Sequence, residues 1–224
     1  MAKMLLQRLK PDTWPLDLND LPEGSVLVGG AVRDGLLDKQ AEVPDLDFVL
    51  PKDAIPTCKN LVQKYGGKCI ELDEKRDIAR YVVKNWKIDL ASQIGENLEA
   101  DLLRRDFSIN AIALNFLSIP FLVDPSGGLQ DLDQMQLVAI NERNLIQDPL
   151  RMLRALRLMS ESNFRLESRT EDWIRTHRKL LYKVASERIK SEIQRLIVGH
   201  WADDVIPLLK QLDLLEPWRE NSEF

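Results

Sequence analysis

Short apolar runs in the first half of the chain predict β-strands. Residues 26–28 (VLV) read as a short buried strand, and 45–50 (DLDFVL) as a second one. Three further runs follow closely, and the middle one is rich in β-branched and aromatic residues. These runs occupy residues 69–72, 78–83 and 86–91.

Two helices are expected among these strands. Gly29 and Gly30 form a tight turn after the first strand, and the following AVRDGLL opens a helix. Residues 53–67 carry helical spacing and end in two glycines, which is typical of a helix stop.

From Pro149 onward, apolar residues recur at i, i+3 and i+4, the spacing of amphipathic helices. The predicted helices cover residues 150–162, 169–184, 186–197 and 202–215. We therefore expect a small α/β domain at residues 1–142, a mixed sheet with helices, followed by an all-helical region at 143–224.

The composition is that of an ordinary globular protein of 224 residues, 44% of them hydrophobic. Its two cysteines, Cys58 and Cys69, form neither a disulfide framework nor a metal-ligand spacing, which favours a reducing compartment. The opening MAKMLLQRLKPDTWP matches neither a secretory signal nor a membrane span, because charges and prolines interrupt it. We expect a cytoplasmic protein without a membrane partner.

Charge is distributed unevenly along the chain. The net charge is −5, yet residues 151–195 hold twelve Lys or Arg and six Asp or Glu, so this segment carries +6 and the remainder −11. A basic second half favours a phosphate-backbone partner, and a solvated helix face is the alternative interpretation.

Asp45 and Asp47 are the most informative residues. On an extended strand, positions i and i+2 point to the same face, so the two carboxylates would stand side by side. A cation between them would relieve their repulsion, and Mg²⁺ prefers carboxylates completed by phosphates and water. The pair predicts a Mg²⁺ site for phosphoryl transfer, although a solvated strand end would also explain it.

Asp89, in WKIDLA, offers a third carboxylate if its strand lies beside residues 45–50. In metal-assisted nucleotidyl transfer, such a group helps to deprotonate or orient the attacking hydroxyl. A surface aspartate beside Lys87 is the alternative.

Arg33 follows the Gly29-Gly30 turn and can add a charge-assisted contact to a phosphate held there. A Gly-Gly turn alone is weak evidence for a phosphate site. The turn gains weight from its spacing to Asp45 and Asp47.

Residues 101–114 place Arg105, Asp106 and Asn110 in an otherwise apolar stretch. Such a set can fix a triphosphate and a ribose, and it can equally form a structural ion-pair network. Residues 123–132 (VDPSGGLQDL) read as a loop, which we expect to join the two domains as a hinge.

Asp148 and Pro149 predict a helix start, with Asp at the N-cap and Pro at the first helical position. Arg151, Arg154 and Arg157 then recur every third residue on one stripe, without acidic residues between them. Their repulsion costs roughly a few tenths of a kcal/mol per pair. An anionic ligand would offset this cost.

The motifs GGAVRD, DLD, DLLRRDFSINA, DPSGGLQDL, QDPLRMLRALR and SERIKSE occur in this order from about Gly24 onward. The chain thereby closely resembles the class II tRNA nucleotidyltransferase and bacterial poly(A) polymerase family. The resemblance implies a nucleotidyltransferase head, a helical neck and the start of a body. It also implies Mg²⁺-dependent, template-independent transfer of CMP or AMP from CTP or ATP to the 3′ end of tRNA, with pyrophosphate released.

For the head, the resemblance makes Asp45 and Asp47 the Mg²⁺ ligands and Asp89 the third carboxylate near the primer hydroxyl. The Gly29-Gly30 turn becomes nucleotide-binding, and Arg33 contacts the triphosphate together with Gly30. Three more residues take nucleotide-binding roles: Arg105 as a further contact, Asp106 and Asn110 on the ribose side.

For the neck, the resemblance makes Asp148 and Arg151 an amino-acid template for the incoming base. The carboxylate would accept from an exocyclic amine, which cytosine and adenine both present, and the guanidinium would donate to ring acceptors. Arg154 and Arg157 would hold the triphosphate. Glu187 and Arg188 would brace the template helix through an ion pair.

Three departures from the family pattern matter. Gln147 stands where the family usually has Glu, which affects base selectivity. The link between Asp89 and Arg104 is short where many CCA-adding members carry a longer flexible loop, so it resembles the CC-adding subgroup. Family members also continue through body and tail helices, which implies a fragment or a need for a partner.

Two alternatives to a CC- or CCA-adding enzyme stay open. The nearest is a poly(A) polymerase or a terminal-A-adding enzyme. The other, from a different class, is a catalytically incomplete RNA- or nucleotide-binding fragment. The oligomeric state is not predicted.

Overall fold

The computed structural model describes residues 1–39, 41–116 and 119–215, and the chain forms two compact units. The first unit contains residues 1–104 and 109–128, and the second contains 105–108 and the chain from 129 onward. The division after Gly128 lies within the segment expected to join two domains. The predicted domain boundary at 142 falls inside the second unit. Each unit is described by itself.

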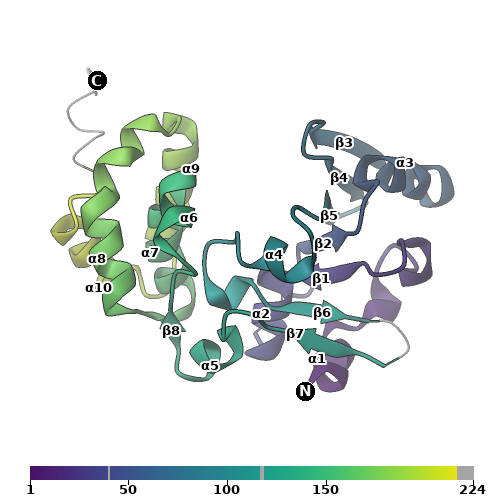
Figure 1. Ribbon diagram of the computed structural model, residues 1–224, viewed down its shortest axis with the longest axis horizontal. Helices are drawn as coiled ribbons and strands as arrows, with labels where there is room; N and C mark the ends of the chain where they lie inside the picture. The colour runs from purple at the N-terminus through teal and green to yellow at the C-terminus, as the bar shows by residue number, and fades with distance from the viewer. Residues whose placement is uncertain (40, 117–118, 216–224) are drawn as a thin grey trace. The chain divides into compact units, whose positions relative to one another are not determined.

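A seven-stranded mixed sheet forms the centre of the first unit as described here (Figure 1). Its order is β3-β4-β5-β2-β1-β6-β7, with β2 and β5 parallel and the other neighbours antiparallel. The five predicted strands are confirmed, and two short strands after residue 112 complete the sheet. The strands are β1 (Val26–Val28), β2 (Leu46–Leu50), β3 (Lys68–Asp73), β4 (Ile78–Val83), β5 (Trp86–Ser92), β6 (Ala113–Asn115) and β7 (Phe121–Val123).

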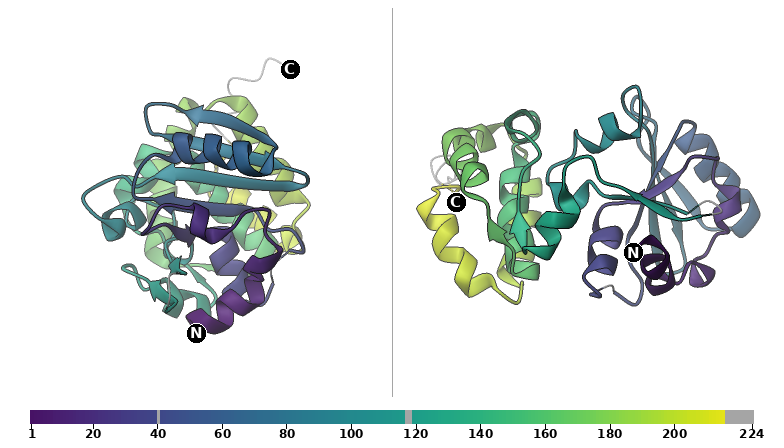
Figure 2. Two further views of the ribbon diagram at one scale, coloured as in Figure 1. Left: turned by 90° about the vertical axis from the view of Figure 1, so that its right-hand side faces the viewer. Right: turned by 60° about the horizontal axis from the view of Figure 1, so that its bottom comes forward.

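Helix α3 (Ala54–Tyr65) covers one face of β3, β4 and β5, and Figure 2 (left) shows it lying across these strands. Its buried residues recur at helical spacing, as the sequence predicts, and they pack over the buried side chains of β4 and β5. The other helical segments of this unit are short: α1 (Ala2–Leu9), α2 (Gly30–Leu36), α4 (Leu98–Leu102), and the 3₁₀ turns η1 (Pro11–Thr13), η2 (Leu18–Asp20) and η3 (Ser108–Asn110), the last reaching across the division.

The opposite face of β3, β4 and β5 is partly open. Along β4, Ala79, Tyr81 and Val83 are buried, whereas Ile78 and Arg80, like Val82, stay partly exposed. This alternation is the period-2 pattern of a strand with one covered face. The open face carries the predicted third carboxylate.

Helices dominate the second unit, where α7 (Leu150–Ser162) packs against α9 (Ser186–Ile197) and α10 (Ala202–Gln211). The predicted helix at 169–184 is divided into α8 (Ser168–His177) and the 3₁₀ segment η4 (Arg178–Lys183). Two short helices precede them, α5 (Gly128–Asp133), which reaches across the division, and α6 (Glu142–Gln147).

The expectation of an all-helical second part was wrong in one detail. Strand β9 (Arg165–Leu166) pairs in parallel with β8 (Gln136–Leu137). A two-residue strand is too short to show a periodicity in the sequence. Whether it forms depends on the strand with which it pairs. The α/β fold followed by a helical part is otherwise confirmed. Among the described residues, no helix is both long and apolar enough to span a bilayer.

Candidate functional site

Two of the predicted carboxylates lie on neighbouring strands. Asp47 on β2 and Asp89 on β5 are direct partners in the parallel register, so their side chains share one face of the sheet. Asp45 lies immediately before β2, two positions from Asp47. The placement of the Asp89 strand beside residues 45–50 is thus confirmed, and Asp47 and Asp89 stand side by side on one face of the sheet.

Arg80 completes this row, and the sequence reasoning missed it. It is the direct partner of Asp89 on β4, and its fork binds both carboxylate oxygens, Nε to Oδ1 at 2.6 Å and Nη2 to Oδ2 at 2.8 Å. Asp89 raises the pKa of Arg80, and Asp45 and Asp47 add smaller effects of the same sign. The alternation in IARYVV, with one charged residue among apolar ones, was the available signal.

Gly29 makes room for Asp47. Its backbone has φ +74°, and a Cβ at this position would lie 2.8 Å from Oδ2 of Asp47. A side chain would therefore be strained by the backbone and would displace the carboxylate. The predicted nucleotide-binding glycine has a direct structural role beside the metal-ligand candidate.

Arg33 and Asn110, predicted to touch different parts of a nucleotide, bind each other. Arg33 Nη1 donates to Oδ1 of Asn110 at 2.8 Å, while its Nε and Nη2 bind both oxygens of Asp34 at 2.7 and 3.0 Å. Arg33 is only 8% exposed. Nη1 thus ties α2 to η3, while Nε and Nη2 bind within α2.

In the second unit, Arg151 and Arg154 hold the segment that carries Arg105 and Asp106. Arg151 Nη1 donates to the carbonyls of Asn144 at 3.1 Å and of Arg105 at 3.4 Å. Arg154 Nη2 lies 3.0 Å from Oδ2 of the buried Asp106. Burial lowers the pKa of Arg151. The predicted nucleotide set is thereby divided, because Asn110 belongs to the first unit.

Asp148 was expected to cap α7, and this detail was wrong. Pro149 occupies the N-cap position, and Asp148 ends α6 instead. Its carboxylate lies 3.2 Å from Nη2 of Arg188 on α9. Arg188, which was expected to brace the template helix through an ion pair, thus pairs with the template residue Asp148 itself.

Arg157 lies in a different environment from Arg151 and Arg154. Its side chain is 7% exposed, with Nε 2.7 Å from Oε2 of Glu192 and Nη1 3.3 Å from Glu161. Glu161 and Glu192 thus offset the repulsion that Arg157 experiences from the other arginines of α7. The sequence had led us to expect an anionic ligand in this role. Burial lowers the pKa of Arg157. These contacts favour a role in joining α7 to α9 over the predicted triphosphate contact.

The residues present fit a Mg²⁺ site of the kind predicted. Among the described residues, no group of three or more His, Cys, Asp and Glu side chains could hold a metal ion. A pair of carboxylates suits Mg²⁺ because this ion usually takes one or two carboxylates and completes its shell with phosphates and water.

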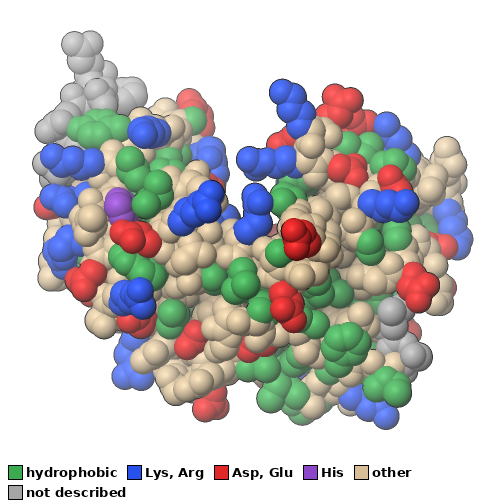
Figure 3. Space-filling model, in the orientation of Figure 1, with side chains coloured by type: hydrophobic (Ala, Val, Ile, Leu, Met, Phe, Trp, Pro, Cys, Tyr) green, Lys and Arg blue, Asp and Glu red, His purple; other side chains and the backbone are tan. Residues whose placement is uncertain are grey.

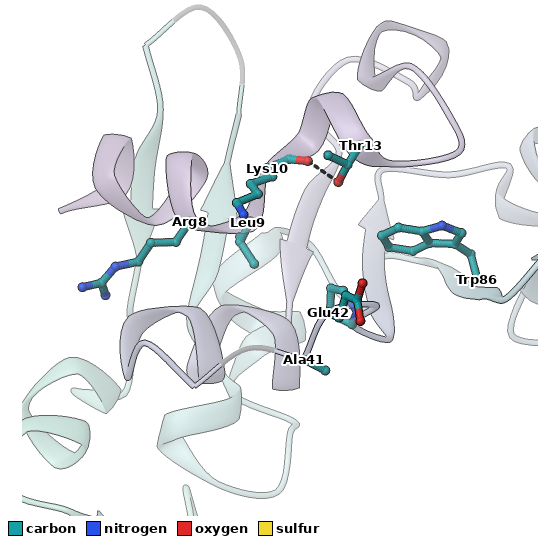
Figure 4. Close-up of a pocket in the computed structure, with 8 residues that line it drawn as sticks. Arg8, Leu9, Lys10, Thr13, Ala41, Glu42 and Trp86 are labelled. Atoms are coloured by element: carbon teal, nitrogen blue, oxygen red, sulfur yellow. Dashed lines mark hydrogen bonds between the residues drawn. The ribbon is translucent and has the colours of Figure 1, made fainter.

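A cavity of about 190 Å³ in the first unit is separate from this row of aspartates (Figure 4). Arg8 lines it, but its guanidinium points away from Trp86 and donates to the carbonyls of Gly35 and Leu36 at 3.1 and 3.2 Å. No predicted site residue lines the cavity, whose polar lining residues are Arg8, Lys10, Thr13 and Glu42. It carries no candidate chemistry.

Comparison with known proteins identifies the family of the chain. Residues 25–138 match the family described as "Poly A polymerase head domain", and residues 163–220 match "Probable RNA and SrmB- binding site of polymerase A". The chain is 43% identical over 183 residues to the CC-adding tRNA nucleotidyltransferase of Synechocystis sp.. It is 38% identical over 204 residues to the A-adding tRNA nucleotidyltransferase of Deinococcus radiodurans.

Solved structures give the same picture. A CCA-adding enzyme in complex with CTP matches with a TM-score of 0.84 and 26% identity, covering 100% of this chain and 55% of that one. A tRNA nucleotidyltransferase with a primer tRNA and an incoming ATP analog matches with a TM-score of 0.75 and 31% identity, covering 89% and 60%.

The chain spans less than half the length of the two named relatives. The Synechocystis match covers 82% of this chain and 44% of the relative, and the Deinococcus match covers 89% and 46%.

Proposed function

Because the chain belongs to the family of tRNA nucleotidyltransferases and poly(A) polymerases, we propose that it transfers nucleotides from CTP or ATP to the 3′ end of tRNA and releases pyrophosphate. The register that sets Asp47 beside Asp89, with Asp45 two residues away, is the observation that carries this proposal. Two carboxylates side by side on a partly open face repel each other, and a bound cation would relieve that repulsion.

Asp45 and Asp47 would hold Mg²⁺, which when bound neutralises the triphosphate and lowers the pKa of the attacking hydroxyl. Asp89 would accept or orient the proton of the RNA 3′ hydroxyl. Arg80 holds the carboxylate of Asp89 by both oxygens and thereby fixes the direction in which it points. Gly29 leaves the space that the Asp47 carboxylate occupies.

In the second unit, Asp148 and Arg151 would read the base. A carboxylate that accepts from an exocyclic amine admits cytosine and adenine and disfavours uracil, which presents a carbonyl there. Arg188 would hold Asp148 in place, and the two carbonyl contacts of Arg151 would orient its guanidinium. Arg154 would reach the triphosphate from beside Asp106.

Among the possible products, we favour addition of CC. The link from Ala91 to Leu103 is short, and in the structure residues 93–97 join the end of β5 to α4. The Synechocystis relative is named CC-adding and the Deinococcus relative A-adding, so terminal A addition is the second candidate. The free cysteines Cys58 and Cys69 suit a reducing cytoplasm, where we place the activity.

End extension of tRNA transcripts tests this proposal. Transcripts that end at the discriminator base, at CC or at CCA are incubated with Mg²⁺ and with CTP and ATP, separately and together. We expect two C residues on the shortest primer and no A afterwards. Addition of CCA, or of A alone, would replace the CC-adding assignment.

An Asp45→Ala, Asp47→Ala double variant is the control for the catalytic assignment. It should bind RNA and lose extension by at least about a thousandfold, since the metal ions supply most of the charge stabilisation. Extension at the wild-type rate would remove the metal assignment. Binding without extension by the wild-type protein would instead favour the binding-fragment alternative.

A further inference from the structure

The partly open face of β3, β4 and β5 continues the row of aspartates outward. The cross-strand partners Asp47, Asp89, Arg80 and Ile70 stand in one line across β2, β5, β4 and β3. Direct partners share a face, so these four side chains lie on the side of the sheet opposite α3. Adjacent strands are about 4.8 Å apart, so Ile70 lies about 14 Å from Asp47.

A second row runs parallel to the first on the same face. Lys68 on β3, Val82 on β4 and Lys87 on β5 are cross-strand partners two residues away from Ile70, Arg80 and Asp89. Both lysines are exposed. Neither has a carboxylate within ion-pair distance in the part of the chain that the structure describes. We call the part of this surface on β3, β4 and β5 the open sheet face. Its residues are Lys68, Ile70, Arg80, Val82, Lys87 and Asp89.

The open sheet face is apolar and basic at once. Ile70 is 46% exposed on the outermost strand, and Val82 between the lysines is partly exposed. Figure 3 shows Lys and Arg side chains beside the part of the first unit that holds β3, β4 and β5. Partly exposed apolar side chains thus stand beside exposed lysines on this face.

An RNA end suits this face better than a protein partner does. A single strand presents bases, which contact apolar side chains, and phosphates, which bind lysine. The face is continuous with Asp89, beside which the proposed reaction requires the 3′ hydroxyl. Its width across β3, β4 and β5 is two strand spacings, or about 10 Å.

We propose that the open sheet face seats the last nucleotides of the RNA acceptor, with bases against Ile70 and Val82 and phosphates at Lys68 and Lys87. This inference rests on the proposed function and adds the track along which the primer reaches the aspartates. Arg80 closes the track at its inner end, where it holds Asp89.

A Lys68→Glu, Lys87→Glu double variant tests the track. With tRNA lacking CCA as the varied substrate, the KM for tRNA should rise about tenfold or more, because two phosphate contacts become repulsions. The KM for CTP and kcat should stay within about twofold. Lys75→Glu is the matched control, since Lys75 is an exposed lysine in the β3–β4 turn and lies off the open face. Its KM for tRNA should be that of the wild type.

Photo-cross-linking gives a second, independent measurement. A tRNA with 4-thiouridine at its 3′-terminal position should cross-link to peptides that contain residues 68–82 or 86–89, and Ile70→Asp should weaken the cross-link. Cross-links found only elsewhere would overturn the track.

The two measurements separate this inference from the proposed function. If the wild-type protein extends tRNA and the double variant keeps the wild-type KM for tRNA, the track is wrong while the function stands, and a protein partner becomes the better occupant. If the wild-type protein extends no RNA and forms no cross-link at this face, both fall.

Discussion

At the scale of single residues, the candidate site depends on Gly29 and Arg80, which contact the carboxylates of the candidate aspartates. The role of Gly29 follows from its contact with Asp47, and the role of Arg80 follows from its hydrogen bond to Asp89. Neither contact is visible in the spacing of the sequence, because it crosses from one strand or turn to another. The aspartates themselves were found from sequence, since a DxD pattern on a strand is a local feature.

Gly29→Ala tests the space beside Asp47. We expect a loss of about 1–2 kcal/mol in the free energy of unfolding from the positive φ, and a fall in transfer rate of at least about tenfold because the carboxylate must move. Urea unfolding and single-turnover extension measure the two effects.

Gly66→Ala is the matched control for this variant. Gly66 has a similar φ of +76°, but a Cβ there would have no neighbour within 4 Å. Gly66→Ala should lose comparable stability and keep its transfer rate. Equal loss of rate in both variants would show that backbone strain alone, and not the Asp47 contact, explains the effect.

At the scale of elements, the start of helix α3 is stabilised by a group that lies more than twenty residues away in the sequence. The N-terminus of α3 receives the Asp77 carboxylate, which accepts from the backbone N–H of Ala54 at 2.8 Å and of Ile55 at 2.9 Å. Burial raises the pKa of Asp77, but these bonds and the Ser92 hydroxyl lower it by more, so the net direction is downward.

This pKa gives α3 a predictable response to acid. A carboxyl whose pKa is lower in the folded state stabilises above its unfolded pKa, near 3.8, and loses that contribution as pH falls through the folded value. We expect Asp77→Asn to cost about 1–2 kcal/mol at pH 7 and to flatten the loss of stability below pH 4.

Urea unfolding at pH 7 and pH 3.5 measures this response. Glu74→Gln, a neutralisation in the same turn, is the control and should retain the wild-type acid response. If Asp77→Asn lost as much free energy of unfolding between pH 7 and pH 3.5 as the wild type, other groups would be responsible for the acid response.

Helix α9 ties the second unit together at two points one turn apart. Arg188 binds Asp148, and Glu192 binds the buried Arg157 of α7. If Arg188 positions Asp148 as a base reader, Arg188→Ala should raise UTP misincorporation about tenfold relative to CTP while the fold persists.

Competition between CTP and UTP in end extension measures this ratio. Arg195→Ala removes a neighbouring exposed ion pair on the same helix, to Glu161, and should leave selectivity unchanged. Unchanged selectivity in Arg188→Ala would leave the ion pair a purely structural contact.

At the scale of the whole molecule, the distribution of charge matters more than its sum. The chain carries −5, yet residues 151–195 carry +6 and the open sheet face adds further cations. We expect tRNA affinity to fall at least about tenfold between 50 and 200 mM KCl, because phosphate contacts release counterions. The KM for CTP should change much less.

Fluorescence anisotropy with labelled tRNA over this salt range makes the measurement. The Lys68→Glu, Lys87→Glu variant should show a shallower logarithmic slope than Lys75→Glu. A salt-independent affinity in the wild-type protein would mean that its negative net charge dominates.

The sequence by itself determined the five strands β1 to β5, helices α3, α7, α9 and α10, and the positions of Asp47 and Asp89 on strands, because periodicity and motif spacing are local. Only the tertiary structure decided that Asp89 is held by Arg80, that Arg33 binds Asn110, and that Arg157 is buried between two glutamates. The physical reason is strand register and helix packing, which bring together side chains from different elements of the chain. Whether an arginine faces a ligand or a neighbouring acid therefore depends on contacts made only in the folded chain.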